Sequence, residues 1–124
     1  MRIVFFGSPN FALPSLLRCI NLDNAKVVAV VTQPDRRQGR KSHLQPTPVK
    51  SMAINYGITN IIQPYKITSD TIKDISQLKP DIGIVVASGH ILPKELLDIF
   101  PNDVINLHGS LLPKHRGASA IANA

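Results

Sequence analysis

The chain has 124 residues, a single cysteine and a net charge of +6 at pH 7. Its hydrophobic fraction of 44% is ordinary for one globular domain, or part of one, and too high for a disordered chain. The lone cysteine, Cys19, excludes an intrachain disulfide framework and a zinc site built on cysteines, and it suits a reducing compartment. The sequence contains no run of about 20 apolar residues that would span a membrane. Its first apolar stretch is also too short for a signal peptide, so we expect a cytoplasmic protein.

The first part of the chain predicts two buried strands joined by a helix. Residues 2–6 form a short apolar run that ends at Gly7, and residues 26–32 form a longer one. Neither run alternates between polar and apolar residues, which is typical of strands buried on both faces in a parallel sheet. Between the strands, Asn10 is expected to cap a helix over residues 11–20, with a proline tolerated in its first turn.

The rest of the chain predicts further strands and helices in alternation. Helices are expected over residues 49–56, 68–78 and 93–99, and strands over residues 61–62, 82–87 and 103–107. This alternation indicates βαβ units, so the expected fold class is α/β with a doubly wound, mostly parallel sheet. Ligands of such sheets bind at the carboxyl ends of the strands. The candidate functional loops are therefore residues 7–10, 33–48, 88–90 and 106–117.

Positive charge is concentrated in the first half of the chain. Residues 1–62 carry eight basic and two acidic side chains, whereas residues 63–124 carry six of each. Four of the basic side chains fall in the long polar loop expected over residues 33–48, namely Arg36, Arg37, Arg40 and Lys41. Such a cluster is typical of a site for a polyanion, and it also occurs in a solvated loop without a partner. Charge alone leaves both interpretations open.

The turn Gly7-Ser8-Pro9-Asn10 lies where a dinucleotide-binding protein carries a glycine-rich fingerprint after its first strand. Only one glycine of that fingerprint is present, and Pro9 lacks an amide donor, so NAD binding is excluded. The turn either lines a substrate site or simply joins a strand to a helix.

The segment after the last expected strand holds the candidate catalytic residues. Asn106 and His108 are two positions apart, so on an extended backbone their side chains project to the same side. An asparagine amide can stabilise a developing oxyanion, and a histidine can move a proton near neutral pH. The pair is therefore a candidate for acyl transfer, or else it satisfies backbone groups of the loop.

Four motifs, in register over nearly the whole chain, resemble the folate-dependent formyltransferase family. Three of them are FFGSPNFALPSL at residues 5–16, VVTQPDRRQGRK at residues 30–41 with LQPTPVK after it, and VVASGHILP at residues 85–93. The fourth, NLHGSLLPKHRG at residues 106–117, resembles the family signature N-x-H-x-S-L-L-P-x-x-R-G. The first two motifs are similar to those of the family members that formylate methionyl-tRNA for translation initiation.

The resemblance implies a fold, a reaction and a set of functional residues. The implied fold is the Rossmann-like formyltransferase fold, and the implied reaction moves a formyl group from 10-formyltetrahydrofolate to initiator methionyl-tRNA without a metal ion. Asn106 and His108 match two of three catalytic residues, which polarise the formyl carbonyl and stabilise the tetrahedral intermediate. Residues 85–92 match a wall of the pterin pocket. The residues that match the folate-binding loop are Ser110, Leu111, Leu112 and Pro113. The residues that match the loop contacting the acceptor end of the tRNA are Arg36, Arg37, Arg40 and Lys41. A monomer without membrane contact is implied.

The resemblance further implies that residues 1–124 are an incomplete N-terminal catalytic domain. The third catalytic residue of the family is an aspartate beyond the S-L-L-P loop, and a C-terminal β-barrel that binds tRNA follows in the family. Neither falls within residues 1–124, so we expect a fragment that is inactive by itself. We also expect it to fold poorly, because the strand over residues 103–107 would expose its edge.

Other acceptors and a loss of catalysis are the alternatives. Related enzymes of the family formylate glycinamide ribonucleotide or an amino sugar, and the R-G-A-S-A-I run at residues 116–121 also resembles a formyltetrahydrofolate hydrolase domain. The long basic loop favours a tRNA acceptor, because a small substrate does not require it. A non-catalytic folate- or RNA-binding remnant is the alternative from a different class. Ser88 and the Ser119-Ala120 pair depart from the usual family residues, and neither is a catalytic position.

Overall fold

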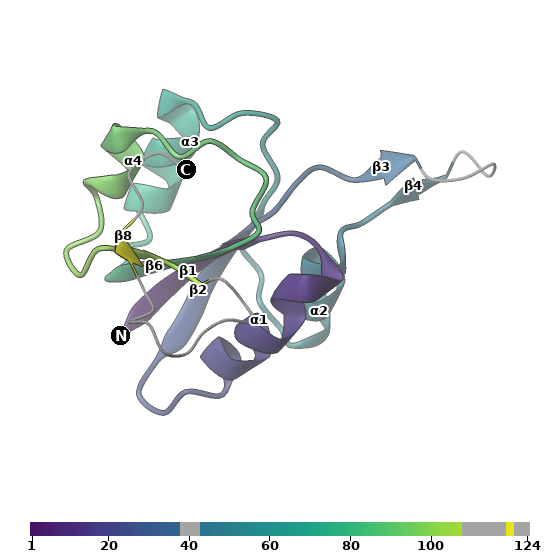
Figure 1. The fold of residues 1–124 in the computed structure, drawn as a ribbon, viewed down its shortest axis with the longest axis horizontal. Helices are drawn as coiled ribbons and strands as arrows, with labels where there is room; N and C mark the ends of the chain where they lie inside the picture. Colours follow the sequence, from purple (N-terminus) through teal and green to yellow (C-terminus); the bar gives the residue numbers. More distant parts are fainter. Residues whose placement is uncertain (38–42, 108–118, 121–124) are drawn as a thin grey trace.

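The fold is a mostly parallel sheet with helices on both faces (Figure 1). This computed structural model describes residues 1–37, 43–107 and 119–120. Within these residues a six-stranded sheet runs in the order β5-β2-β1-β6-β7-β8, parallel throughout except for the antiparallel pair of β7 and β8. Its strands are β1 (Arg2–Gly7), β2 (Lys26–Val31), β5 (Ile61–Ile62), β6 (Ile82–Val86), β7 (Val104–Asn106) and β8 (Ser119–Ala120). The doubly wound α/β sheet expected from the sequence is confirmed.

Four α-helices of the described residues cover this sheet. They are α1 (Leu13–Ile20), α2 (Pro48–Asn55), α3 (Ser69–Ser76) and α4 (Lys94–Leu97). Two short strands between β2 and α2 are not part of this sheet. They are β3 (Arg36–Arg37) and β4 (Leu44–Gln45), which pair with each other in a separate antiparallel hairpin. Threonines begin two of the helices: the hydroxyl of Thr47 accepts a hydrogen bond from the Lys50 amide, and Thr68 forms a capping box with Thr71.

β1 is the centre of the sheet and of both hydrophobic cores. Ile3 and Phe5 pack in the core on the side of α1 and α2, whereas Val4 and Phe6 pack in the core on the side of α3 and α4. All four side chains are at most 1% exposed. Burying each of them fully contributes about 1.5–3 kcal/mol. The continuous apolar run of the sequence therefore reflects burial on two faces.

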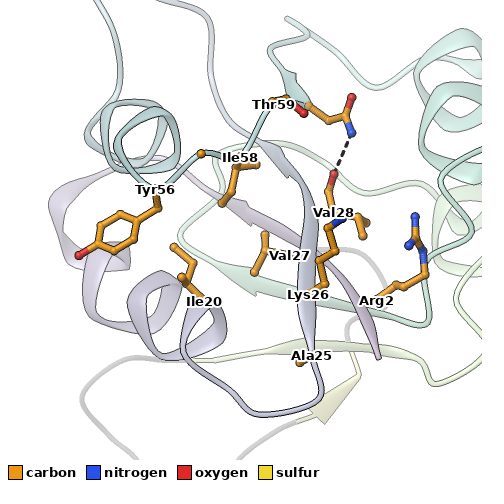
Figure 2. Close-up of a pocket in the computed structure, with 11 residues that line it drawn as sticks. Arg2, Ile20, Ala25, Lys26, Val27, Val28, Tyr56, Ile58 and Thr59 are labelled. Carbon is orange, nitrogen blue, oxygen red and sulfur yellow. Dashed lines mark hydrogen bonds between the residues drawn. The ribbon is translucent and has the colours of Figure 1, made fainter.

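β2 contains an extra residue relative to β1. Ile3 pairs with Val27 and the next residue, Val4, pairs with Ala29, so Val28 has no partner on β1. A bulge of this kind interrupts the regular ladder and leaves backbone groups to be satisfied in another way. The Nδ2 group of Asn60 donates a hydrogen bond of 3.0 Å to the Val28 carbonyl, drawn as the dashed line in Figure 2.

Three details of the chain differ from the sequence-based expectations. Asn10 does not cap the first helix: it starts a 3-10 turn over Asn10–Ala12, and α1 begins at Leu13 without a side-chain cap. Pro14 in the first turn has no amide hydrogen, which reduces the number of donors that a cap would serve. Residues 33–48 were expected to be a loop throughout, but they contain the β3–β4 hairpin.

The third difference concerns the edge of β7. The edge was expected to be bare, whereas Ile105 pairs with Ala120 and Asn106 pairs with Ser119 of β8. That pairing covers backbone groups that would otherwise be open to another chain, so this part of β7 gives no reason to expect poor folding.

Cys19, in α1, is buried, and burial raises the pKa of its thiol to about 11 against the opposing charge of Arg18. The thiol is therefore a protonated core side chain.

Replacing Gly7 by alanine should destabilise the fold. A Cβ atom at Gly7 would lie 2.8 Å from the carbonyl oxygen of Val86 and 2.8 Å from Cε2 of Phe5. The Val86 carbonyl belongs to the β6 backbone and cannot withdraw without disturbing the sheet, so we expect a loss of about 1–3 kcal/mol. The midpoint of thermal unfolding measures it. Ser51→Ala, at an exposed position of α2, is the control, and an equal midpoint for both variants would contradict the prediction.

Candidate active site

The candidate site lies at the carboxyl edge of the sheet, where three chain segments leave neighbouring strands. Gly7 pairs with Val86, and Val85 pairs with Asn106, so the ends of β1, β6 and β7 are in register. The Leu107 amide continues this pairing with a 2.8 Å hydrogen bond to the Val85 carbonyl. The turn after β1 and the end of β7 thus share one sheet edge, as the sequence predicted. His108, Ser110, Leu111, Leu112 and Pro113 lie outside the described residues.

Asn106 is the predicted catalytic residue that the structure describes. Val104, two positions earlier, packs in the core beside α3 and α4, so Asn106 lies on that same face of β7. Its side chain is partly exposed, and no other described residue is hydrogen-bonded to it. Leu107 packs on the opposite face, with the core beside α1 and α2. The loop that follows Leu107 lies outside the described residues, so the role of the Asn106 amide toward a ligand or toward that loop stays a prediction.

The segment after β6, the strand that pairs with β7 at Asn106, forms a half-buried wall in which Ser88 and His90 are buried and Ala87 and Gly89 are exposed. Ala87 and Gly89 both have positive φ, of 50° and 82°, and these two positions turn the chain sharply after β6. The Ser88 hydroxyl accepts a hydrogen bond of 3.1 Å from the His90 amide. A Cβ at Gly89 would come within 2.8 Å of Nε2 of Gln33, so the side chain that follows β2 reaches across β1 to this wall.

His90 ties this wall to the segment that follows β5. Its ring is buried, and Nε2 lies 2.7 Å from the Pro64 carbonyl oxygen. A carbonyl can only accept, so Nε2 carries the hydrogen and donates it. The other ring nitrogen, Nδ1, is buried and has no hydrogen-bond partner among the described residues. In a neutral ring, this arrangement leaves an unused acceptor inside the protein.

Ser8, in the turn after β1, joins this turn to the segments that follow β2 and β6. Its hydroxyl donates to the Ser88 carbonyl at 3.2 Å and accepts from the Gln33 amide at 3.1 Å and from the Thr32 hydroxyl at 3.2 Å. The turn after β1 is therefore a structural tie between the ends of β2 and β6. Sequence reasoning missed Ser8, Thr32 and Ser88 as a set. The signal was present, because each is a hydroxyl residue directly or almost directly after a buried apolar strand.

Hollows occur at both ends of the sheet. At the carboxyl edge, one of about 200 Å³ lies between Ser8, Arg36 and Pro46, and one of about 360 Å³ lies beside Ile67, His90 and Ile91. A further hollow of about 320 Å³ lies at the amino ends of β1 and β2, and Figure 2 shows Arg2 and Lys26 on its border. Volume alone does not select a site, whereas the meeting of three strand ends beside Asn106 does.

The hairpin of β3 and β4 carries part of the predicted basic cluster. It projects from the body of the molecule beyond the carboxyl edge (Figure 1). Arg36 and Arg37 are exposed on β3, and Arg40 and Lys41 lie outside the described residues.

The described residues include no group of three or more His, Cys, Asp or Glu side chains that could hold a metal ion. In that same part of the chain, no helix is long and apolar enough to cross a membrane.

Comparison with known proteins decides the family. The family model described as "Formyl transferase" matches residues 1–124. The chain belongs to the formyl transferase family. The methionyl-tRNA formyltransferase of Trichlorobacter lovleyi is 48% identical over 121 residues, which are 97% of this chain and 38% of that protein. The methionyl-tRNA formyltransferase of Citrifermentans bemidjiense is 50% identical over 122 residues, with shares of 98% and 38%.

A solved structure supports the fold. The crystal structure of phosphoribosylglycinamide formyltransferase from Brucella melitensis aligns with a TM-score of 0.59 and 22% sequence identity. The alignment covers 94% of this chain and 60% of that one. The resemblance to the formyltransferase fold stated from the motifs is confirmed. The chain spans 38% of the length of the two methionyl-tRNA formyltransferases compared above.

Proposed function

We propose that this chain forms part of the catalytic domain of an enzyme that transfers the formyl group of 10-formyltetrahydrofolate to the amino group of initiator methionyl-tRNA. The observation that carries the proposal is the 48% identity, over 97% of the chain, to a protein named methionyl-tRNA formyltransferase. The basic hairpin beyond the carboxyl edge supports an RNA acceptor. The partners are the tRNA and the folate, and the place of action is the cytoplasm.

The Asn106 side chain has the chemistry that the reaction requires. The methionyl amine attacks the formyl carbon, a C–N bond forms, and the carbonyl electron pair moves to oxygen. The amide of Asn106 donates a hydrogen bond to that oxyanion, which stabilises the tetrahedral intermediate more than the ground state. His108 shares this role by its match to the family signature. When the intermediate collapses, the oxyanion electron pair re-forms the carbonyl and the bond to the folate nitrogen breaks; the attacking nitrogen loses a proton and the departing folate nitrogen takes one.

The folate occupies the same edge of the sheet in this proposal. Ser110, Leu111, Leu112 and Pro113 are assigned to its binding by their match to the family loop. The wall that follows β6 supports this assignment, because β6 pairs with β7 at Asn106 and hydrogen bonds of Ser88 and His90 fix the segment that follows. A bound donor would therefore face a rigid backbone on one side and the Asn106 amide on the other.

A small amine acceptor is the alternative within the family. The 22% identity of the glycinamide ribonucleotide enzyme speaks for the fold and not for the acceptor. A phosphorylated small molecule does not need a hairpin that extends away from the body of the protein. Arg36 and Arg37 are exposed on that hairpin, where they are suited to the phosphates of a large acceptor.

The complete gene product tests the proposal directly. Incubated with 10-formyltetrahydrofolate, it should convert initiator methionyl-tRNA to formylmethionyl-tRNA, and it should leave glycinamide ribonucleotide unchanged. Acid gel electrophoresis of the tRNA and chromatography of the nucleotide measure the two products. Formylation of glycinamide ribonucleotide alone would overturn the assignment of the acceptor, and no product from either acceptor would favour a non-catalytic binding remnant.

Asn106→Ala and His108→Ala should each lower kcat far more than they raise the KM of either substrate. Groups that bind a developing oxyanion act in the transition state, and removal of one such donor costs about 10²–10³ in rate. Steady-state kinetics with both substrates varied provide the measurement. Asn102→Ala, at an exposed turn before β7, is the matched control and should retain full activity. A variant that mainly raises the KM for the folate would show that its residue binds rather than catalyses.

Neutralising the basic cluster should weaken tRNA binding and leave folate binding unchanged. The quadruple replacement of Arg36, Arg37, Arg40 and Lys41 by glutamine removes side chains that are suited to bind phosphates. The plot of log K against log salt should then become shallower by about 0.7–0.9 for each phosphate that the protein no longer neutralises. The control variant has the same net charge and replaces four lysines outside the hairpin by glutamine: Lys26, Lys73, Lys79 and Lys94. An identical slope in the cluster variant and the wild type would mean that the basic loop is merely solvated.

A further inference from the structure

The base of the β3–β4 hairpin is fastened by one acidic side chain, Asp35. The Nζ of Lys50, on α2, donates to Oδ1 and Oδ2 of Asp35 at 3.1 and 3.2 Å. The Nε2 of Gln63, just after β5, donates to Oδ1 of Asp35 at 2.8 Å and to the Gln33 carbonyl at 3.2 Å. Asp35, Lys50 and Gln63 are called the hairpin anchor below. It connects the first leg of the hairpin to a helix and to the edge strand of the sheet.

The second leg of the hairpin is tied to the first by hydroxyl groups. The Oγ1 atoms of Thr32 and Thr47 are 2.6 Å apart. Thr32 precedes the first leg, and Thr47 ends the second leg at the start of α2. Thr32 donates its hydrogen to Ser8, so the hydrogen between the threonines comes from Thr47. Both legs therefore leave the body of the protein from fixed points, and Asp35 is the last fastened residue before the arginines.

The position of Asp35 is unfavourable for attraction of a polyanion. It directly precedes Arg36 and Arg37, and its carboxylate reduces the positive potential that a phosphate would meet there. Hydrogen bonds from Gln63, and then those from Lys50, lower the pKa of Asp35, so the carboxylate stays charged at neutral pH. The ion pair is partly exposed, with side-chain exposures of 21% for Lys50 and 29% for Asp35. Pairs of this kind add little to stability.

We propose that Asp35 is a positioning residue for the RNA acceptor: through Lys50 and Gln63 it sets the direction in which the hairpin presents Arg36 and Arg37. The inference rests on the proposed function, and it adds a residue that contacts neither the reacting atoms nor the RNA. If the anchor is broken, the hairpin samples several directions, and only a fraction of the molecules present the arginines correctly. The apparent affinity for the RNA falls by that same fraction.

Charge and positioning give opposite signs for the same substitution. Asp35→Asn removes a negative charge next to the basic cluster, so electrostatics alone makes RNA binding tighter. Loss of the anchor makes it weaker. Asp35→Ala removes the same charge and also the acceptor that Asn retains for Gln63. Positioning therefore predicts a graded loss, smaller for Asn than for Ala, whereas an effect of charge predicts equal gains.

The experiment measures steady-state kinetics of the complete gene product with initiator methionyl-tRNA and 10-formyltetrahydrofolate. If one molecule in ten keeps the correct direction, Asp35→Ala raises the KM for the tRNA about tenfold, with kcat and the KM for the folate within twofold. The salt dependence of tRNA binding should keep its slope, because the molecules that bind still neutralise the same phosphates. The matched control is Asp98→Asn, which removes the charge of an exposed ion pair outside the hairpin. In that pair, Lys94 of α4 lies 3.3 Å from Asp98, the residue that follows the helix. This variant should change none of these values.

A double-mutant cycle separates positioning from general destabilisation. Lys50→Met alone should weaken tRNA binding, and the double variant with Asp35→Ala should be no weaker than the worse single variant, because both remove the same anchor. The thermal midpoints of all variants should stay within a few degrees of the wild type. An unchanged or lowered KM for the tRNA in Asp35→Ala, or additive losses in the cycle, would overturn the proposal.

Failure of the proposed function has a different signature. A wild-type protein that binds tRNA in a filter assay but forms no formylmethionyl-tRNA contradicts the enzymatic proposal alone. The Asp35 variants are then compared by the same binding assay, and a graded loss still supports positioning. A wild-type protein that binds no tRNA in this assay overturns both.

Discussion

Burial of β1 on both faces is the constraint on which the rest of the structure depends. Phe5 and Phe6 point to opposite cores and are both fully buried, so helices must cover both sides of the strand. Pairing with β2 on one edge and β6 on the other places β1 in the centre. Later strands can then be added only at the two edges of the sheet, next to β2 or next to β6. The connections to these two sides diverge at the carboxyl end of β1. Ligand sites of doubly wound sheets form at such a point.

Hydroxyl side chains make this divergence rigid. Where apolar strands end, their backbone groups need partners that the sheet no longer supplies. Ser8 supplies them for the ends of β2 and β6, and Thr32 passes the connection to Thr47 and α2. The base of the basic hairpin is thereby attached to the ends of β2 and β6, and the backbone of Asn106 is attached to β6 through strand pairing. The proposed transfer of a formyl group to a large acceptor would use such a frame, because the amine must meet the formyl carbon in a defined position.

The sequence was most informative where a physical signal was local. Continuous apolar runs identified β1, β2 and β6, since two-sided burial leaves a clear pattern in the sequence. The prediction that Asn10 caps the first helix was wrong because a 3-10 turn intervenes and Pro14 leaves one amide donor fewer for a cap to accept from. The hairpin of β3 and β4 was missed because strands of two residues are too short to show a periodicity in the sequence. The pairing of β8 depends on contacts distant in the chain. Asn106 remains a prediction from its chemistry and spacing, whereas the hydroxyl ties became evident as a set only from the hydrogen bonds of the structure.

The bulge at Val28 determines which way Thr32 faces. In a regular strand the facing of side chains alternates, so one extra residue reverses the phase of all residues that follow it. Val28 and Ala29 both pack in the core beside α3 and α4, after which Val30 returns to the side of α1 and α2. Counting onward, Thr32 also falls on the side of α2, where it meets Thr47. A strand of the same residues without the bulge would turn Thr32 toward α3. One additional residue near the start of β2 thus decides on which face of the sheet the Thr32–Thr47 contact forms at the other end of the strand.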